Sequence, residues 1–262
     1  MNLAEFFFRE LNVFVGGRHT WALLSLQDIK SRYRRSVIGP FWITLTSIFF
    51  VAGLGIVYAR LLGLNLKEYL PYLATGIIVW TFLTTLISEG ANSLIGAGHI
   101  IKQIQLPYMT HVMRIVFRNF IVFLHSWVIL IPLLIWYGSL TVYGFFVAIF
   151  GIFLSLFALT PLVTILAVLC ARYRDVVPMI GSGLQLLFFV TPVMWHPEQL
   201  GGLTVVIRYN IFSYFIDLVR EPMLNGYFPL HSAEIVFVFG VLCWGIAFLA
   251  LFLNRKKIPY WL

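Results

Sequence analysis

Charged residues are scarce in this chain. Only 11% of its 262 residues are Asp, Glu, Lys or Arg, whereas 61% are hydrophobic. In a soluble domain about a quarter of the residues are usually charged. A soluble fold of this length lacks the interior volume to hide so much apolar surface. The composition therefore excludes an ordinary soluble domain and favours a membrane protein.

Motifs for catalysis and nucleotide binding are also missing. The sequence contains no GxxxxGK[ST], HExxH or GxSxG, which hold nucleotide phosphates, a catalytic zinc ion or an activated serine. No pair of carboxylates lies deep within an apolar segment. Cys170 and Cys243 lie inside apolar runs without CxxC spacing, so we expect them to be packing residues. The sequence therefore predicts no enzymatic activity, cofactor or metal site.

What the chain does have is six long apolar runs. Each is about twenty residues long, which is the length that an α-helix needs to cross the ~30 Å hydrocarbon core of a bilayer. Backbone groups in lipid must be hydrogen-bonded within the segment, and a helix does this. We therefore predict an all-α polytopic membrane protein. The predicted spans are residues 40–59, 70–87, 115–136, 143–170, 177–195 and 233–253.

The distribution of Lys and Arg predicts the orientation of these spans. Fourteen of the 18 lie in the termini and alternate loops on one side, and four, Arg60, Lys67, Arg208 and Arg220, lie on the other. Cytoplasmic loops carry the excess of positive charge. Both termini are therefore expected in the cytoplasm. The formal charge of +8 is then a sign of topology, and no nucleic-acid partner is expected.

The residues before the first span form a separate region, 1–36, ahead of the membrane domain, 37–262. Polar and apolar residues alternate with helical spacing over 2–14 and again over 22–36, which predicts two amphipathic helices at the membrane interface. The second helix carries several basic residues. Attraction to anionic headgroups is one explanation for them.

Two loops are more apolar than ordinary loops. Residues 196–232 contain an apolar run interrupted by Arg208, Asn210 and Asp217. A seventh span would bury these polar groups at membrane depth. We expect short helices that partly re-enter the bilayer from outside, or an amphipathic helix on the outer surface. The second loop, residues 88–113, carries a short apolar helix that fits either a soluble partner or the inner leaflet.

Three segments resemble a known family. They are DIKSRYRRSVIGPFWITLTSIF, RYRDVVPMIGSGLQLLFFVTPVMW and RYNIFSYFIDLVREPMLNG, beginning at Asp28, Arg172 and Arg208. Together they are similar to the membrane subunit of ATP-binding-cassette exporters of the O-antigen, teichoic-acid and capsule class. The resemblance implies a homodimer with two copies of a separate ATPase in the bacterial inner membrane. It also implies a polysaccharide substrate on a polyprenyl-diphosphate lipid, a coupling helix near Lys102, and gate helices after Trp195.

Three sets of candidate residues follow. Arginine forks hold phosphate oxygens in pairs, so a diphosphate site is expected at Lys30, Arg32, Arg34 and Arg35. Aromatic rings pack on the C–H faces of sugars, so the polymer is expected to pass Tyr58, Phe188, Phe189, Trp195, Tyr209 and Tyr214. For any one ring, a place in the core or the interfacial belt is the alternative. The ATPase is expected to dock on Ile100, Ile101, Lys102 and Ile104.

Two other functions remain open from the residues alone. One is ATP-driven export of a smaller lipid or drug. The other is ion-coupled secondary transport, which usually needs paired buried charges or broken helices at mid-membrane. His125 is the only ionisable residue well inside a predicted span, but Thr160-Pro161 and Thr191-Pro192 could break helices.

Overall fold

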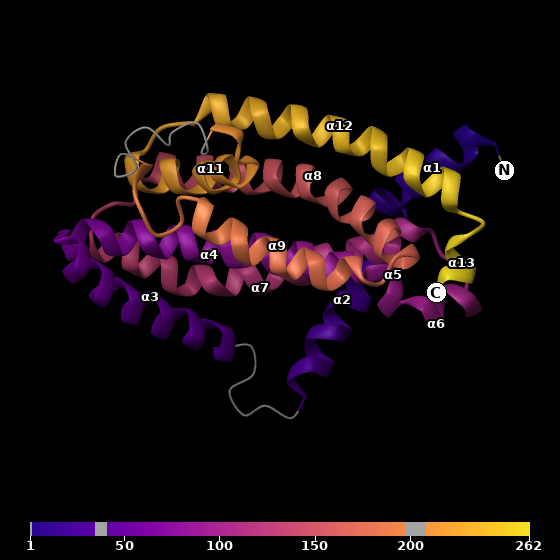
Figure 1. Cartoon of the computed structure of the whole chain (residues 1–262), viewed down its shortest axis with the longest axis horizontal. Helices are drawn as coiled ribbons and strands as arrows, with labels where there is room; N and C mark the ends of the chain where they lie inside the picture. The colour runs from indigo at the N-terminus through magenta and orange to yellow at the C-terminus, as the bar shows by residue number, and fades with distance from the viewer. Residues whose placement is uncertain (1, 35–40, 198–207) are drawn as a thin grey trace.

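The structure is a computed structural model that describes residues 2–34, 41–197 and 208–262. These residues form helices joined by short turns, with no strand among them. Figure 1 shows long helices running side by side. Both termini lie at one end of this bundle, together with α5 (Ser93–Gly96), α6 (Gly98–Gln103) and α13 (Ile258–Trp261). α11 (Ile211–Asn225) lies at the other end. The predicted all-α class is confirmed.

Four helices are long and apolar enough to cross a membrane. They are α4 (Leu66–Ala91), α7 (Tyr108–Trp136), α8 (Val142–Arg172) and α12 (Leu230–Asn254). Two of the predicted spans are shorter apolar helices in the described chain. These are Leu45–Leu61 within α3 (Phe41–Leu62) and the whole of α9 (Val176–Val190). The predicted first residue of span one, Pro40, lies outside the described residues.

Two Thr-Pro pairs behave differently. α9 ends at Val190, before the predicted limit near Trp195, because Thr191 is extended, as expected for a residue that precedes proline. α8 instead continues through Pro161, so this Thr-Pro pair, which could have broken a helix, does not do so. Proline removes the N–H that would bond to the carbonyl four residues earlier. That carbonyl, on Phe157, accepts a hydrogen bond from Trp244 Nε1 of α12 at 3.1 Å.

The core of the bundle forms around α8, which packs against α4, α11 (Ile211–Asn225) and α12. Gly151 lets α8 and α11 approach closely, since a Cβ there would lie 2.2 Å from the Leu218 carbonyl oxygen. Phe215, Ile216 and Leu218 of α11 are fully or almost fully buried. α11 therefore lies inside the bundle and does not rest on its surface. The segment 198–207, which the predicted outer helices include, lies outside the described residues.

Two helices precede the long ones, as the sequence predicts. They are α1 (Leu3–Val15), which begins with a capping box between Asn2 and Glu5, and α2 (Arg18–Tyr33). The buried stripe of α1 is Phe6, Glu10 and Val13. The helical spacing of the sequence predicts an apolar stripe one residue further on, at Leu3, Phe7, Leu11 and Phe14, but Phe7 is exposed. The buried stripe therefore includes a carboxylate, that of Glu10.

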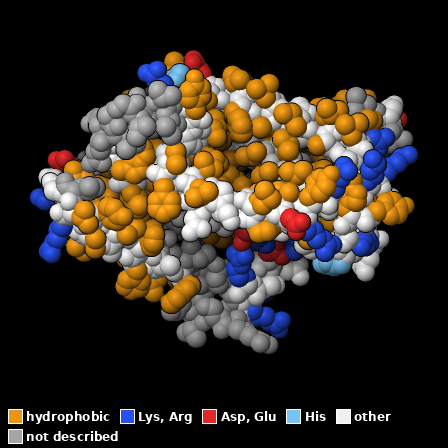
Figure 2. Space-filling view, in the orientation of Figure 1, with side chains coloured by type: hydrophobic (Ala, Val, Ile, Leu, Met, Phe, Trp, Pro, Cys, Tyr) orange, Lys and Arg blue, Asp and Glu red, His pale blue; other side chains and the backbone are white. Residues whose placement is uncertain are grey.

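Charge and apolar surface are segregated along the molecule. Figure 2 shows hydrophobic side chains over the middle of the bundle and most of the visible Lys and Arg side chains at the right-hand end and beneath it, with smaller groups at the left-hand end. In Figure 1 the termini, α6 (Gly98–Gln103) and α13 (Ile258–Trp261) occupy that right-hand end. The loops predicted to share one side of the membrane therefore meet at one end of the fold.

Candidate functional site

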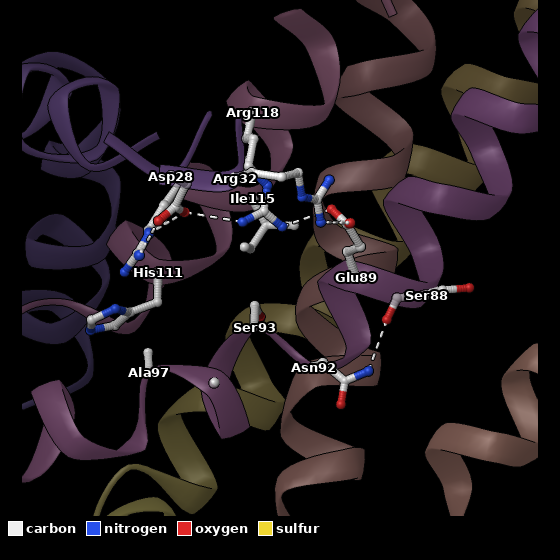
Figure 3. Close-up of a pocket in the computed structure, with 12 residues that line it drawn as sticks. Asp28, Arg32, Ser88, Glu89, Asn92, Ser93, Ala97, His111, Ile115 and Arg118 are labelled. Carbon is white, nitrogen blue, oxygen red and sulfur yellow. Dashed lines mark hydrogen bonds and ion pairs between the residues drawn. The ribbon is translucent and has the colours of Figure 1, made fainter. Parts of the chain in front are cut away.

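A cluster of ion pairs joins α2, α4 and α7 close to the basic end of the bundle (Figure 3). Asp28 of α2 accepts hydrogen bonds from Arg114 Nε at 2.7 Å and from Arg118 Nη1 at 3.0 Å. A second contact joins Arg114 Nη2 to the other carboxylate oxygen. Arg114 and Arg118 lie four residues apart and therefore share one face of α7. Asp28 thus holds the amphipathic helix α2 against a long apolar helix.

Glu89, near the end of α4, forms the other half of this cluster. Its carboxylate accepts bonds from Arg32 Nη2 and Arg118 Nη2, both at 2.7 Å, and from Asn119 Nδ2 at 2.8 Å. Arg118 is the centre of the cluster because it contacts both carboxylates. Its side chain is mostly buried, so removing one partner would leave a charge poorly solvated. Three guanidinium groups against two carboxylates leave a net positive charge.

The cluster forms one wall of a cavity of about 450 Å³. Ser93 and His111 line the opposite side (Figure 3), and both are almost completely buried. Neither the Ser93 hydroxyl nor either ring nitrogen of His111 has a hydrogen-bonding partner among the described residues. Buried polar atoms usually have partners. A cavity with positive charge and unused polar atoms can bind an anionic group.

The structure separates the three described residues of the set predicted to bind a diphosphate, Lys30, Arg32 and Arg34. Arg32 points into the cluster and pairs with Glu89, while Lys30 and Arg34 are exposed on and just after α2. Arg35 lies outside the described residues. The sequence reasoning missed the larger group, Asp28, Glu89, Arg114, Arg118 and His111. The spacing of Arg114 and Arg118 at the start of a span was the available signal.

The predicted docking residues lie on α6 and directly after it. Ile100 and Ile101 are half-buried, Lys102 is exposed, and 55% of the Ile104 side chain is exposed. Ile101, Lys102 and Ile104 line a surface cavity of about 510 Å³ together with Arg255 and Tyr260. The C-terminal residues therefore share this surface with α6.

Glu10 fixes the chain that follows α6, which the sequence did not predict. Its carboxylate accepts the backbone N–H groups of Tyr108 and Met109 at 3.3 and 2.9 Å, at the start of α7. The first N–H groups of a helix have no partner within the helix. Burial raises the pKa of Glu10, and these hydrogen bonds and nearby Arg9 oppose the rise. α1 thus holds the first turn of α7.

The predicted aromatic residues differ in burial and in contacts. Phe188 packs on Trp80 with ring centroids 5.7 Å apart, whereas 66% of neighbouring Phe189 is exposed. Trp195 Nε1 donates to the Phe189 carbonyl at 3.3 Å. Of the other members of the set, Tyr58 packs against the core and Tyr209 is largely exposed.

Tyr214 is the sixth predicted ring, and it lies on α11. Its hydroxyl donates to the Arg208 carbonyl at 2.8 Å, and the ring is half-buried. α11 also carries Arg220, which the sequence analysis counted only as an outer charge. Arg220 is 2% exposed and donates to the carbonyls of Pro192 and Val193 at 2.7 and 2.9 Å. Its guanidinium lies 3.8 Å from the centroid of the Tyr72 ring.

Three curated proteins are similar to this chain over most of its length. Two are named O-antigen export system permease protein RfbA from Klebsiella pneumoniae. One is 24% identical over 91% of this chain and 92% of its own length, and the other is 22% identical over 84% and 86%. The third carries the same name in Myxococcus xanthus, with 22% identity over 90% of this chain and 92% of its own length.

A family model for membrane transporters also matches the chain. The match covers residues 19–224, from α2 through most of α11. It includes the charge cluster, α5 and α6, and the shorter helix α9. Since this is well over half of the sequence, the chain belongs to the ABC-2 type transporter family.

Proposed function

We propose that this chain is the membrane subunit of an ATP-driven exporter that moves a polysaccharide attached to a polyprenyl-diphosphate lipid. The observation that carries this proposal is the similarity to three O-antigen export permeases over more than four fifths of the chain. Membership of an ABC family implies an ATP-binding partner. The ion-coupled alternative is therefore dropped. The assignment of the substrate rests on the names of the similar proteins and on the chemistry of the cavities in this structure.

In this proposal six helices cross the bacterial inner membrane, with both termini in the cytoplasm. Lys and Arg residues gather at the end of the bundle that holds the termini, which supports this orientation. α9 is short for a span, at about 22 Å for 15 residues. The non-helical segment that begins at Thr191 would complete the crossing.

Two copies of the chain would pair with two copies of a separate ATPase. We place the ATPase on α6, at Ile100, Ile101, Lys102 and Ile104. Ile104 is the most accessible apolar side chain there, with 55% exposed. A partly exposed apolar residue beside a lysine suits a cleft on a soluble partner. Movement of α6 would reach α7 directly, because the intervening chain is short and α7 is anchored by Glu10.

The lipid diphosphate would bind at the basic end of the bundle. Lys30, Arg34 and Arg35 would draw the headgroup to α2, and Arg32 would connect this surface to the cavity beside Arg114 and Arg118. The net positive charge of that cavity and its unpaired His111 and Ser93 support an anionic ligand. Arginine suits phosphate because its planar fork makes two parallel bonds.

The polymer itself would pass the exposed aromatic side chains. Phe189 and Tyr209 are exposed, and Tyr58, Phe188, Trp195 and Tyr214 are half-buried. Rings provide sliding contacts to varied sugars, since they need no exact hydrogen-bond geometry.

Export can be tested in cells that lack this gene. Deletion should remove polysaccharide from the cell surface and leave lipid-linked polymer inside, and the unchanged chain should restore export. Arg32, Arg34 and Arg35 changed together to Lys should keep the charge but lower export about tenfold, because the planar forks are lost. Arg174→Lys, on the same side, is the matched control.

The outcome also separates the competing substrates. If the deletion strain keeps normal surface polysaccharide, the polysaccharide proposal is wrong, and export of a smaller lipid or drug becomes the better explanation. Full export by the triple Lys variant would instead leave the polysaccharide function intact and remove the specific role of these arginines.

A further inference from the structure

A second polar cavity lies at the end of the bundle opposite the termini. It has a volume of about 520 Å³ and lies between the start of α4, the segment after α9, and α11. Glu68, Tyr72, Asp217, Arg220, Glu221 and Tyr227 line it. We call it the α11 cavity. It shares no residue with the charge cluster or with the predicted polymer-binding rings.

The walls of the α11 cavity combine hydrogen-bond acceptors with one fixed donor group. Glu68, Asp217 and Glu221 provide carboxylates against the single guanidinium of Arg220, so the cavity is formally negative. Phosphate and other anions are therefore disfavoured. No three acidic, histidine or cysteine side chains lie close enough to hold a metal ion in the part of the chain that the structure describes.

The hydrogen bonds of Arg220 indicate that a ligand in this cavity would also have to accept hydrogen bonds. Two of its nitrogens are bound to the carbonyls of Pro192 and Val193, but Nε has no partner among the described residues. A buried donor left without an acceptor destabilises the folded protein. Hydroxyl groups are both donors and acceptors. A hydroxylated ligand can therefore bond to the carboxylates and to a guanidinium at once.

Aromatic rings complete the wall. Tyr72 is held beneath Arg220, and the tilted ring of His196 packs against it at a centroid distance of 3.9 Å. Tyr227 is half exposed at the cavity. Sugars present C–H faces that pack on such rings while their hydroxyls bond to polar groups. Charged acceptors, a buried donor and rings together form a wall suited to carbohydrate.

We propose that the α11 cavity binds sugar units of a neutral, hydroxyl-rich polysaccharide. The proposal rests on the proposed export function and adds a contact that the polymer makes at the end of the bundle opposite the ATPase surface. Because Arg220 is tied to the chain that follows α9, a sugar held here would lie directly against α11 and that segment.

Photochemical crosslinking in exporting cells tests this contact. Tyr227 is replaced with p-benzoylphenylalanine in the full chain, expressed with its ATPase partner, and the irradiated subunit is purified and stained for polysaccharide. The matched control carries the same group at Tyr143, an exposed tyrosine at the start of α8. We expect polysaccharide adducts at 227 to exceed those at 143 about tenfold.

A pair of variants tests whether the cavity itself is occupied. Ser139 lines it from the turn between α7 and α8. Ser139→Trp should fill the space and lower crosslinking at 227 about tenfold, whereas Ser139→Ala should not. Asn225, also in the lining, takes the photoreactive group if the 227 variant does not reach the membrane.

The results separate this proposal from the export function. Equal labelling at 227 and 143, adducts with phospholipid alone, or no effect of Ser139→Trp would overturn the sugar site while surface polysaccharide still depends on the chain. Normal surface polysaccharide in the deletion strain would overturn the export function first.

Discussion

The guanidinium of Arg220 occupies the space beside Gly76 that any larger residue would need. A Cβ at position 76 would lie 1.9 Å from Arg220 Nη2 and 2.5 Å from the Val193 carbonyl oxygen. The same guanidinium bonds to that carbonyl. One glycine on α4 therefore permits the contact that joins α4, α11 and the end of α9.

Gly76→Ala should destabilise the protein by about 2 kcal/mol, because the added methyl group displaces Arg220 from its two carbonyls. The measurement is the midpoint of thermal unfolding in detergent. Gly53→Ala is the control, since a Cβ there meets nothing within 4 Å. Equal midpoints for the two variants would show that Arg220 can move without cost.

Trp244→Phe should lower the free energy of unfolding by about 1 kcal/mol, because the Phe157 carbonyl loses the indole donor in an apolar environment. Pro161→Ala in the same chain should recover the loss, since alanine restores the N–H that proline lacks. Unfolding in mixed detergent micelles measures both. If Pro161→Ala gives no recovery, the indole acts only through ring packing.

Asp28→Asn and Glu89→Gln should not have additive effects. Both carboxylates bind Arg118, so the first change already removes one of its ion pairs before the second change is made. A double-mutant cycle on the free energy of unfolding should show a coupling of about 1 kcal/mol. Asp28→Asn combined with Asn65→Ala, at the far end of α4, should be additive. Additivity in both pairs would contradict a shared role for Arg118.

Ile104→Asp should reduce co-purification of the ATP-binding partner about tenfold, because a carboxylate in an apolar cleft must lose its hydration. Ile104 is a better position than Ile101, which also packs in the core beside α1. Val15→Asp, another exposed apolar position, is the control. A partner that remains bound to the Ile104 variant must dock elsewhere.

Stability should fall as the pH rises past Asp217's pKa. Burial raises the pKa of Asp217 from 3.8 to about 6, with Arg220 opposing and Glu221 adding to the rise. The folded state thus holds this proton more tightly than the unfolded state. The stabilisation is complete below pH 3.8 and is lost as the pH rises through about 6. The free energy of unfolding should fall by up to about 3 kcal/mol over this range.

The expected result is a lower unfolding midpoint at about pH 7 than at about pH 4. Asp217→Asn should be more stable than the unchanged protein at the higher pH, because it carries no charge to bury. Tyr227→Phe serves as a control in the same cavity. Parallel pH curves for the unchanged chain and the Asn variant would contradict this assignment.

The sequence alone determined which segments form the long apolar helices. Apolar runs of membrane length can satisfy their backbone only as helices, so α4, α7, α8 and α12 follow from composition and periodicity. Thr191 before Pro192 similarly indicated where α9 could end, because that preference is local. The charge bias and three family-like segments pointed to an exporter subunit without any knowledge of contacts.

Only the tertiary structure decided which polar residues meet. Arg32 pairs with Glu89, 57 positions away, and Glu10 bonds to Met109, 99 positions away. Helical periodicity relates residues within a few turns and carries no information about the neighbouring helix. The partner of the carbonyl that Pro161 leaves without an N–H likewise comes from another helix, at Trp244. These contacts form when packed helices bring buried charges and unpaired backbone groups together, and such groups are stable in the interior only with partners.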